Sequence, residues 1–222
     1  MFLRRKSKIE QENMYKAINK LNIFSNFFSK ESQENFKNAI QITDDFAYLL
    51  SNYGWYISSD MSWKLVFDIF QAVKKDDVKF INNTVKKYYN ENFETKLKVL
   101  VRKFPERKDI IIEAFEAHKK KMYFSSTTLF LTQTDGLCQG RLFRNKKARE
   151  LLTNEKKRRS IFNAVLAKES AINVDTRKVD NSNYKSDLNR HAIMHGFDTK
   201  YSSEVNSLKA LSILCFVSDY IE

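Results

Sequence analysis

The chain has 222 residues and a mass of 26.3 kDa, enough for one large domain or two small ones with a real core. Only 4 glycines and 1 proline are present, which favours an all-α fold. No run of 18 apolar residues occurs, so we expect no membrane span, and the first residues lack the apolar stretch of a signal peptide. The net charge of +12 favours a polyanionic partner, although a Lys-rich soluble protein would show it too.

The first half of the chain shows apolar residues at three- and four-residue steps, the period of amphipathic helices. The pattern predicts helices over residues 8–28, 31–51, 62–74, 76–90 and 92–103. Pro105, the only proline, follows the last of them, and we place a boundary there between an N-terminal helical region (1–105) and a C-terminal helical bundle (106–222). The aromatic residues near Trp55 and Trp63 are expected in the core or in a dimer contact.

The second half continues the helical pattern and ends in the most apolar segment of the chain. Helices are predicted over 107–121, 122–143, 145–152, 156–170, 184–195 and 203–221, with a loop over 171–183. Gly196 is a natural left-handed stop for the helix before it. The final helix is apolar nearly all round and is therefore expected to be buried. Cys138 and Cys215 are isolated, make no metal-binding spacing and indicate free thiols, which suits a cytoplasmic protein.

Positive charge is concentrated in residues 119–159, which hold 12 basic and 3 acidic side chains. This run is the best candidate for contacts with an RNA backbone, which give affinity rather than sequence choice. Phe143 and Phe162 lie close enough in sequence to offer stacking surfaces for bases. The alternative is an ordinary solvated helical face. The predicted RNA-binding residues are Arg141, Arg144, Lys146, Lys147, Arg149, Lys156, Lys157, Arg158 and Arg159.

Two of the three histidines lie in one string with an arginine, Arg190-His191-Ala192-Ile193-Met194-His195. Histidine exchanges protons near neutral pH, and arginine presents a charged planar fork that fits a phosphate. His195 falls in the last turn of its predicted helix, where the helix dipole favours the protonated ring of a general acid. The combination is suited to phosphodiester chemistry without a metal or another cofactor.

Helix geometry separates the members of this string. His191 and His195 are four residues apart and share a face, whereas Arg190 lies about 140° around the helix from His195. Pairing of two such helices across a two-fold axis is a simple way to bring the groups together. The spacing therefore favours a homodimer with a composite site.

The arginine, four intervening residues and histidine, with polar His191 directly after Arg190, resemble the signature of the HEPN superfamily. The resemblance covers about residues 107–222. It implies a small helical bundle that dimerises, and many members are metal-independent ribonucleases of toxin–antitoxin and phage-defence systems. It also implies attack of an RNA 2′-OH on the adjacent phosphate, with Arg190 holding the phosphate, His195 moving the proton and His191 orienting or assisting.

One position departs from a subgroup of that family. HEPN toxins paired with nucleotidyltransferase antitoxins carry a tyrosine two residues after the histidine, where this chain has Phe197, and the nearest tyrosine is Tyr201. The sequence therefore gives no support for silencing by modification of a tyrosine at that position.

Asp135 is a fourth candidate for the site, because it interrupts an otherwise apolar predicted helix. A buried carboxylate needs a partner, and Asp135 could hold Arg190 or His191 in place. The alternative is that Asp135 faces water beside a kink at Gly136.

The string itself has two alternative interpretations. In one, Arg190 forms a surface ion pair with Asp187 or Glu204 and His195 only caps its helix. In the other, Asp187, His191 and His195 share a helical face and bind a metal, although no further cluster completes such a site.

The sequence leads to the hypothesis of a metal-independent endoribonuclease of a toxin or abortive-infection system, with Arg190, His195, His191 and Asp135 as its catalytic residues. Its expected partners are RNA, a second copy of the chain, and an antitoxin or another defence protein. A non-catalytic module that binds RNA or protein is the alternative. A weaker third hypothesis is an interaction protein that works through its aromatic N-terminal half.

Overall fold

The computed structural model describes residues 43–144, 147, 165–166, 170–175 and 185–221. These residues contain helices and no β-strand, so the predicted all-α fold is confirmed for this part of the chain. Residues 44–222 form one compact unit, and the other unit, residues 1–43, lies almost wholly outside the described residues. The helices predicted over 8–28, 31–51, 145–152 and 156–170 also fall wholly or mainly outside them, and only residues 43–51 of the second are described.

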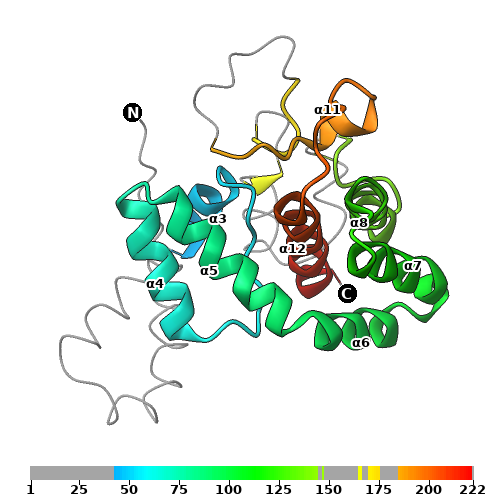
Figure 1. The fold of residues 1–222 in the computed structure, drawn as a ribbon, viewed down its shortest axis with the longest axis horizontal. Helices are drawn as coiled ribbons and strands as arrows, with labels where there is room; N and C mark the ends of the chain where they lie inside the picture. The colour runs from blue at the N-terminus through cyan, green and yellow to red at the C-terminus, as the bar shows by residue number, and fades with distance from the viewer. Residues whose placement is uncertain (1–42, 145–146, 148–164, 167–169, 176–184, 222) are drawn as a thin grey trace. The chain divides into compact units, whose positions relative to one another are not determined.

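The helices of the described part follow the apolar periodicity of the sequence closely (Figure 1). Side-chain caps fix four of their starts, because Ser62, Asp77, Asn189 and Ser203 each accept a hydrogen bond from a backbone N–H in the first turn. In chain order the elements are α3 (Thr43–Ser51), α4 (Trp63–Lys74), α5 (Val78–Glu91), α6 (Phe93–Lys103), the 3₁₀ turn η2 (Pro105–Arg107), α7 (Lys108–Lys119), α8 (Tyr123–Leu137), α11 (Arg190–Met194) and α12 (Glu204–Tyr220).

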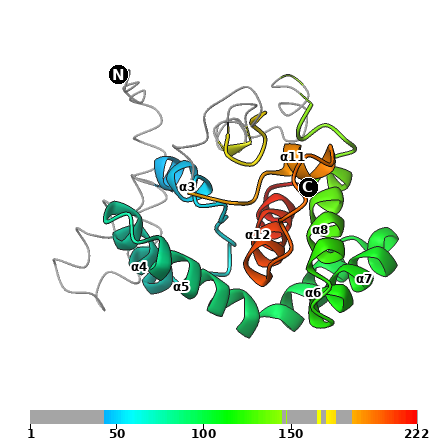
Figure 2. The same ribbon diagram turned by 45° about the horizontal axis from the view of Figure 1, so that its top comes forward.

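Helix α12 is the centre of the fold. It lies between α5 and α8 and also contacts α6, as two views of the ribbon show (Figures 1 and 2). Every residue from Asn206 to Ser218 is buried, which confirms the prediction of a buried final helix. None of the described helices has the length and hydropathy that crossing a bilayer requires.

Both ends of α12 are held by charged side chains of the helices around it. At its start, Glu204 lies 2.9 Å from the Lys86 ammonium of α5. At its end, the Lys103 ammonium of α6 donates to the carbonyl oxygens of Ser218 and Ile221. An anion at the first turn and a cation at the last both complement the helix dipole. These contacts join segments on the two sides of Pro105, and the division of the chain at that residue remains a prediction.

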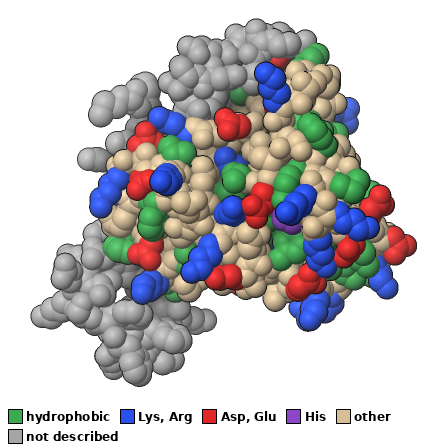
Figure 3. Space-filling model, viewed as in Figure 1, with side chains coloured by type: hydrophobic (Ala, Val, Ile, Leu, Met, Phe, Trp, Pro, Cys, Tyr) green, Lys and Arg blue, Asp and Glu red, His purple; other side chains and the backbone are tan. Residues whose placement is uncertain are grey.

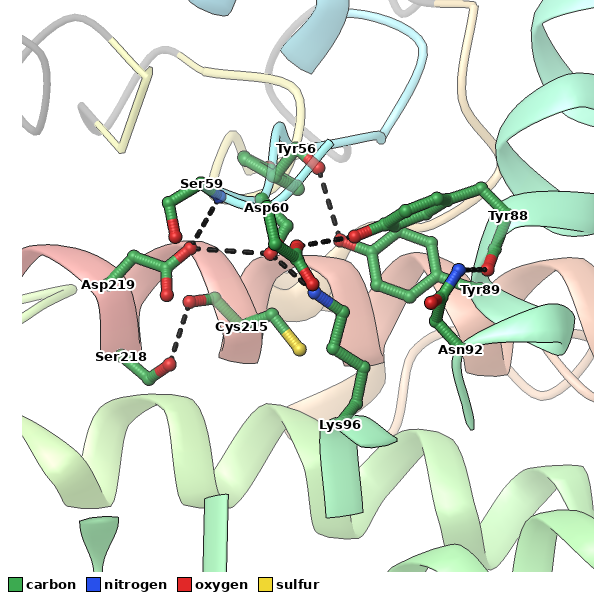
Figure 4. Close-up of polar contacts among 11 residues, drawn as sticks. Tyr56, Ser59, Asp60, Tyr88, Tyr89, Asn92, Lys96, Cys215, Ser218 and Asp219 are labelled. Atoms are coloured by element: carbon green, nitrogen blue, oxygen red, sulfur yellow. Dashed lines mark hydrogen bonds and ion pairs between the residues drawn. The ribbon is translucent and has the colours of Figure 1, made fainter. Parts of the chain in front are cut away.

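A polar network beside α12, centred on the buried Lys96 ammonium, joins α5, α6 and the segment before α4 (Figure 4). The Lys96 ammonium, on a residue only 4% exposed, donates to Ser58 Oγ at 2.7 Å and to the Asp60 carboxylate. The Tyr88 hydroxyl donates to the same carboxylate. Burial alone would raise the pKa of Asp60, but hydrogen bonds from Lys96, Tyr88 and Ser58 outweigh it and lower that pKa. We call this set the Lys96 network.

The aromatic residues around Trp55 divide between core and surface. Trp55 and Tyr56 are almost completely buried, and Trp55 stacks on Tyr89 with ring centroids 6.2 Å apart. Trp63, by contrast, is 48% exposed at the start of α4. The expectation of a core position therefore holds for Trp55 and not for Trp63.

Candidate active site at α11

The helix that carries the Arg-His string is shorter than predicted. Asn189 caps it, since its Oδ1 accepts from the Ala192 N–H at 2.7 Å and its Nδ2 donates to the carbonyls of Ala171 and Val174. The prediction of helix over 184–195 is therefore wrong for residues 185–189, and residue 184 lies outside the described residues. The buried cap explains the difference, because it ties the segment before α11 to residues 171–174 rather than to a longer helix.

The end of α11 agrees with the sequence. Gly196 adopts φ +72°, the left-handed conformation expected of it, and the Phe197 N–H donates back to the Ala192 carbonyl at 2.8 Å. His195 stands at the C-cap position directly before this turn, and its side chain is exposed.

The Arg190 guanidinium is partly buried and makes no hydrogen bond with the described residues. Its Nη2 lies 3.7 Å from Asp135 Oδ2, and its Cζ lies 4.6 Å from the ring centroid of Phe143. Its Nε is buried without a hydrogen-bond partner. Burial lowers the pKa of Arg190, and the nearby Asp135 carboxylate opposes that shift. The group remains a cation, and the N–H donors of its exposed edge make no hydrogen bond within the described residues.

Asp135 lies beside Arg190, as one of the two interpretations of the sequence expects. It belongs to the last turn of α8, and its Oδ1 accepts from the Leu142 N–H at 3.1 Å. Helix α8 ends at Leu137 rather than near residue 143, because Gln139 and Gly140 both adopt positive φ. The chain then turns back and places Phe143 against Arg190.

The two histidines of the string lie together, as their spacing predicts. The ring centroids of His191 and His195 are 4.5 Å apart. His191 Nε2 lies 3.8 Å from Asp175 Oδ1, an ion pair when the ring is protonated. The structure thus gathers two neighbouring pairs, Arg190 with Asp135 and His191 with His195. We call these four residues, with Asp175, the α11 cluster.

Two features of the α11 cluster were not predicted from the sequence. Asp175 was assigned to a loop without a role, and its only signal is a carboxylate that directly follows the segment Ala171-Ile172-Asn173-Val174. Phe143 was expected to stack on a base and instead lies against a guanidinium. No periodic pattern in the sequence predicts either contact, because each joins two segments that are separated along the chain.

One part of the alternative interpretations agrees with the structure, because His195 stands at the C-cap of α11. The ion pairs and the metal site that they expect are not seen in the described residues. Glu204 is engaged by Lys86 and Asn90, and Asp187 precedes α11 instead of sharing its face. In the described part of the chain, no group of three or more His, Cys, Asp or Glu side chains is arranged to hold a metal ion.

The predicted RNA-binding run is only partly described. Arg141, Arg144 and Lys147 are exposed. On the face of the molecule in Figure 3, basic and acidic side chains alternate over the described part. The other residues of the run, Lys146, Arg149, Lys156, Lys157, Arg158 and Arg159, lie outside the described residues, as does Phe162.

An open hollow of about 660 Å³ adjoins α11. Among the residues that line it are Asp187, Ala192, Phe197, Asp198, Lys200 and Asn206, but none of Arg190, His191 or His195. We call it the α11 hollow. Behind it, the Lys209 ammonium is buried 3.4 Å from Oγ of Ser186, another lining residue, and burial lowers the pKa of Lys209 to about 8.

Comparison with known proteins adds no relative to this description. No family model, no curated protein and no solved structure matches the chain.

Proposed function

We propose that the chain is a metal-independent endoribonuclease and that the α11 cluster is its active site. The observation that carries the proposal is the Arg190 guanidinium, which is held in place by a carboxylate and an aromatic ring while its N–H donors make no hydrogen bond in the described part of the chain. A half-buried guanidinium of this kind binds a phosphate strongly, because the ligand supplies the missing hydrogen bonds.

The neighbouring imidazoles supply the proton transfers that cleavage needs. The RNA 2′-oxygen attacks the adjacent phosphorus, the O2′–P bond forms and the P–O5′ bond breaks. His191, which lies 3.8 Å from the Asp175 carboxylate, accepts the 2′-OH proton, and exposed His195 donates a proton to the leaving O5′. The products are a 2′,3′-cyclic phosphate and a 5′-hydroxyl, and Arg190 stabilises the extra charge of the transition state.

A second copy of the chain and a role in defence are parts of the same proposal. The support for both is the resemblance of the Arg190–His195 string to the HEPN signature. In a dimer, two α11 helices would face one groove, so that each RNA strand meets side chains from both copies.

The proposal is tested by RNA cleavage in excess EDTA. We expect the wild type to release products with 2′,3′-cyclic phosphate ends and His195→Ala to be slower by about 100-fold or more. His118→Asn is the matched control, because His118 lies on α7, outside the α11 cluster. Its ring is hydrogen-bonded to Ser207, and the oxygen of the asparagine can replace that bond. Loss of wild-type cleavage in EDTA, or full activity of His195→Ala, would reject the proposal.

A non-catalytic module that binds RNA or protein is the second candidate. It is favoured by one observation, that carboxylates lie beside both Arg190 and His191 and could serve only to hold the turn after α11 in shape. Such a module would bind single-stranded RNA with a steep dependence on salt and leave it intact in the assay above.

A further inference from the structure

Phe197 joins the α11 hollow to the α11 cluster. Its side chain lines the hollow, and its ring lies 5.9 Å from the His195 ring at an interplanar angle of only 20°. The residue is 48% exposed, so part of its surface is open to a ligand. An exposed aromatic ring next to a phosphate-binding group is how proteins stack the unpaired bases of single-stranded nucleic acids.

The charged side chains that line the hollow are predominantly acidic, and the hydroxyls of Ser186, Tyr201 and Ser203 lie among them. Asp187 and Asp198 contribute carboxylates, against the single cation of Lys200. Asn206, only 5% exposed, donates from Nδ2 to the Tyr201 carbonyl at 3.2 Å, which fixes its Oδ1 as an acceptor that has no partner in the described residues. This lining disfavours a phosphate and suits an uncharged group rich in N–H donors.

We infer that the α11 hollow binds a nucleobase with an exocyclic amino group, in a single-stranded RNA whose adjacent phosphate lies at the α11 cluster. Adenine, cytosine and guanine each offer such an amino group to the carboxylates and to Asn206. Uracil has none, and its two carbonyl oxygens would face those acceptors. The inference rests on the proposed function, because the position of the phosphate comes from it.

The test uses a single-stranded 2′-O-methyl RNA of eight nucleotides with one 2-aminopurine among uridines. Without a free 2′-OH this probe cannot be cut, so binding is read independently of catalysis. Wild type is expected to quench the aminopurine fluorescence on binding, and Phe197→Leu to weaken binding about tenfold. Phe80→Leu, at a 43% exposed phenylalanine of α5, is the matched control and should bind as wild type does. Equal binding by Phe197→Leu and wild type would overturn the inference.

Base preference is tested with the fluorescein-labelled probe and a labelled all-uridine strand. We expect the all-uridine strand to bind wild type at least about fivefold more weakly. Asp198→Asn should reduce the difference in affinity between the two strands. The asparagine oxygen can still accept the hydrogen bond from the Lys200 backbone N–H, and its NH₂ group adds a donor suited to uracil. Equal binding of both strands by wild type would also overturn the inference.

Failure of this inference can be told apart from failure of the proposed function. If cleavage depends on His195, but neither Phe197→Leu nor replacement of the aminopurine by uridine alters RNA binding, only the base site is rejected. If RNA is never cut but Phe197 and the amino group still govern binding, the nuclease proposal fails, and the hollow remains a base site of a binding module.

Discussion

Lys96 and Arg190 are two cations that are buried to different degrees. They also differ in how many of their N–H donors make hydrogen bonds. Lys96 has a carboxylate and a hydroxyl within hydrogen-bond distance, and the ring of Tyr88 lies 5.2 Å away (Figure 4). Arg190 has an ion pair at 3.7 Å and an aromatic ring at 4.6 Å, but no hydrogen bond among the described residues. A cation whose donors are hydrogen-bonded within the protein stabilises the fold, whereas a cation with unsatisfied donors can bind an anionic ligand.

The largest expected effect tests Arg190 through activity. Arg190→Ala should lower kcat/KM for RNA cleavage about 1,000-fold, because loss of such a donor removes about 4 kcal/mol of transition-state stabilisation. Its free energy of unfolding should change by about 1 kcal/mol or less, since the variant loses one ion pair with Asp135 and the contact with the Phe143 ring but no hydrogen bond among the described residues. Arg102→Ala, at an exposed arginine of α6, is the control. A large loss of stability in Arg190→Ala would show that Arg190, like Lys96, mainly stabilises the fold.

The second effect tests Lys96 through stability. Lys96→Met should lower the free energy of unfolding by about 2 kcal/mol in urea titrations, because it removes the donor that buried Ser58 and half-exposed Asp60 share. Lys98→Met, on the exposed side of the same helix, should change it by less than about 0.5 kcal/mol. If the two variants unfold alike, the Lys96 network does not stabilise the fold.

Lys209 is a third buried cation, and its removal is expected to stabilise the protein, in contrast to the removal of Lys96. Burial lowers its pKa to about 8 from 10.5, so the folded protein bears the cost of a charged amine at any pH below about 8. Lys209→Met should therefore raise stability at pH 7 by about 2 kcal/mol, and the gain should shrink as the pH rises from about 8 to 10.5. Urea titrations at pH 7 and pH 10 measure this, and a gain that grows with pH would contradict the assignment.

The smallest expected effect concerns His118, a buried group outside the α11 cluster. Burial lowers its pKa from 6.5 and the Glu204 carboxylate opposes the shift, so the unfolded chain takes up the proton first as the pH falls through 6.5. The folded state should lose stability below that pH and be unaffected above it. Wild type should therefore lose a few degrees more of Tm than His118→Asn between pH 7.5 and pH 5.5. Parallel losses in the two proteins would exclude His118 as the cause.

The long helices could be predicted from the sequence, because their signal is local. The expected ranges 62–74, 92–103 and 203–221 differ from α4, α6 and α12 by one residue at most at either end. Amphipathic periods and capping residues determine such elements without knowledge of the rest of the chain. The two larger errors, at the end of α8 and the start of α11, arise where side chains bond to distant backbone or where two successive residues adopt positive φ.

The candidate site was predictable in its members and less so in its arrangement. The string identified Arg190, His191 and His195, and the lone carboxylate of Asp135 pointed to a partner for Arg190. Asp175 and Phe143 reach the site through turns whose course depends on tertiary packing. The buried Lys96 and Lys209 were missed for the same reason, since a lysine in a helical pattern is ordinarily a surface residue.

The central position of α12 has a consequence for how this protein is made. Residues 204–220 leave the ribosome after every other described helix, yet α5, α6 and α8 all pack against them. Until then those helices have only one another to cover their apolar faces. The native core therefore depends on contacts that span more than 100 residues, such as Lys86 with Glu204, and cannot close before α12 has been synthesised.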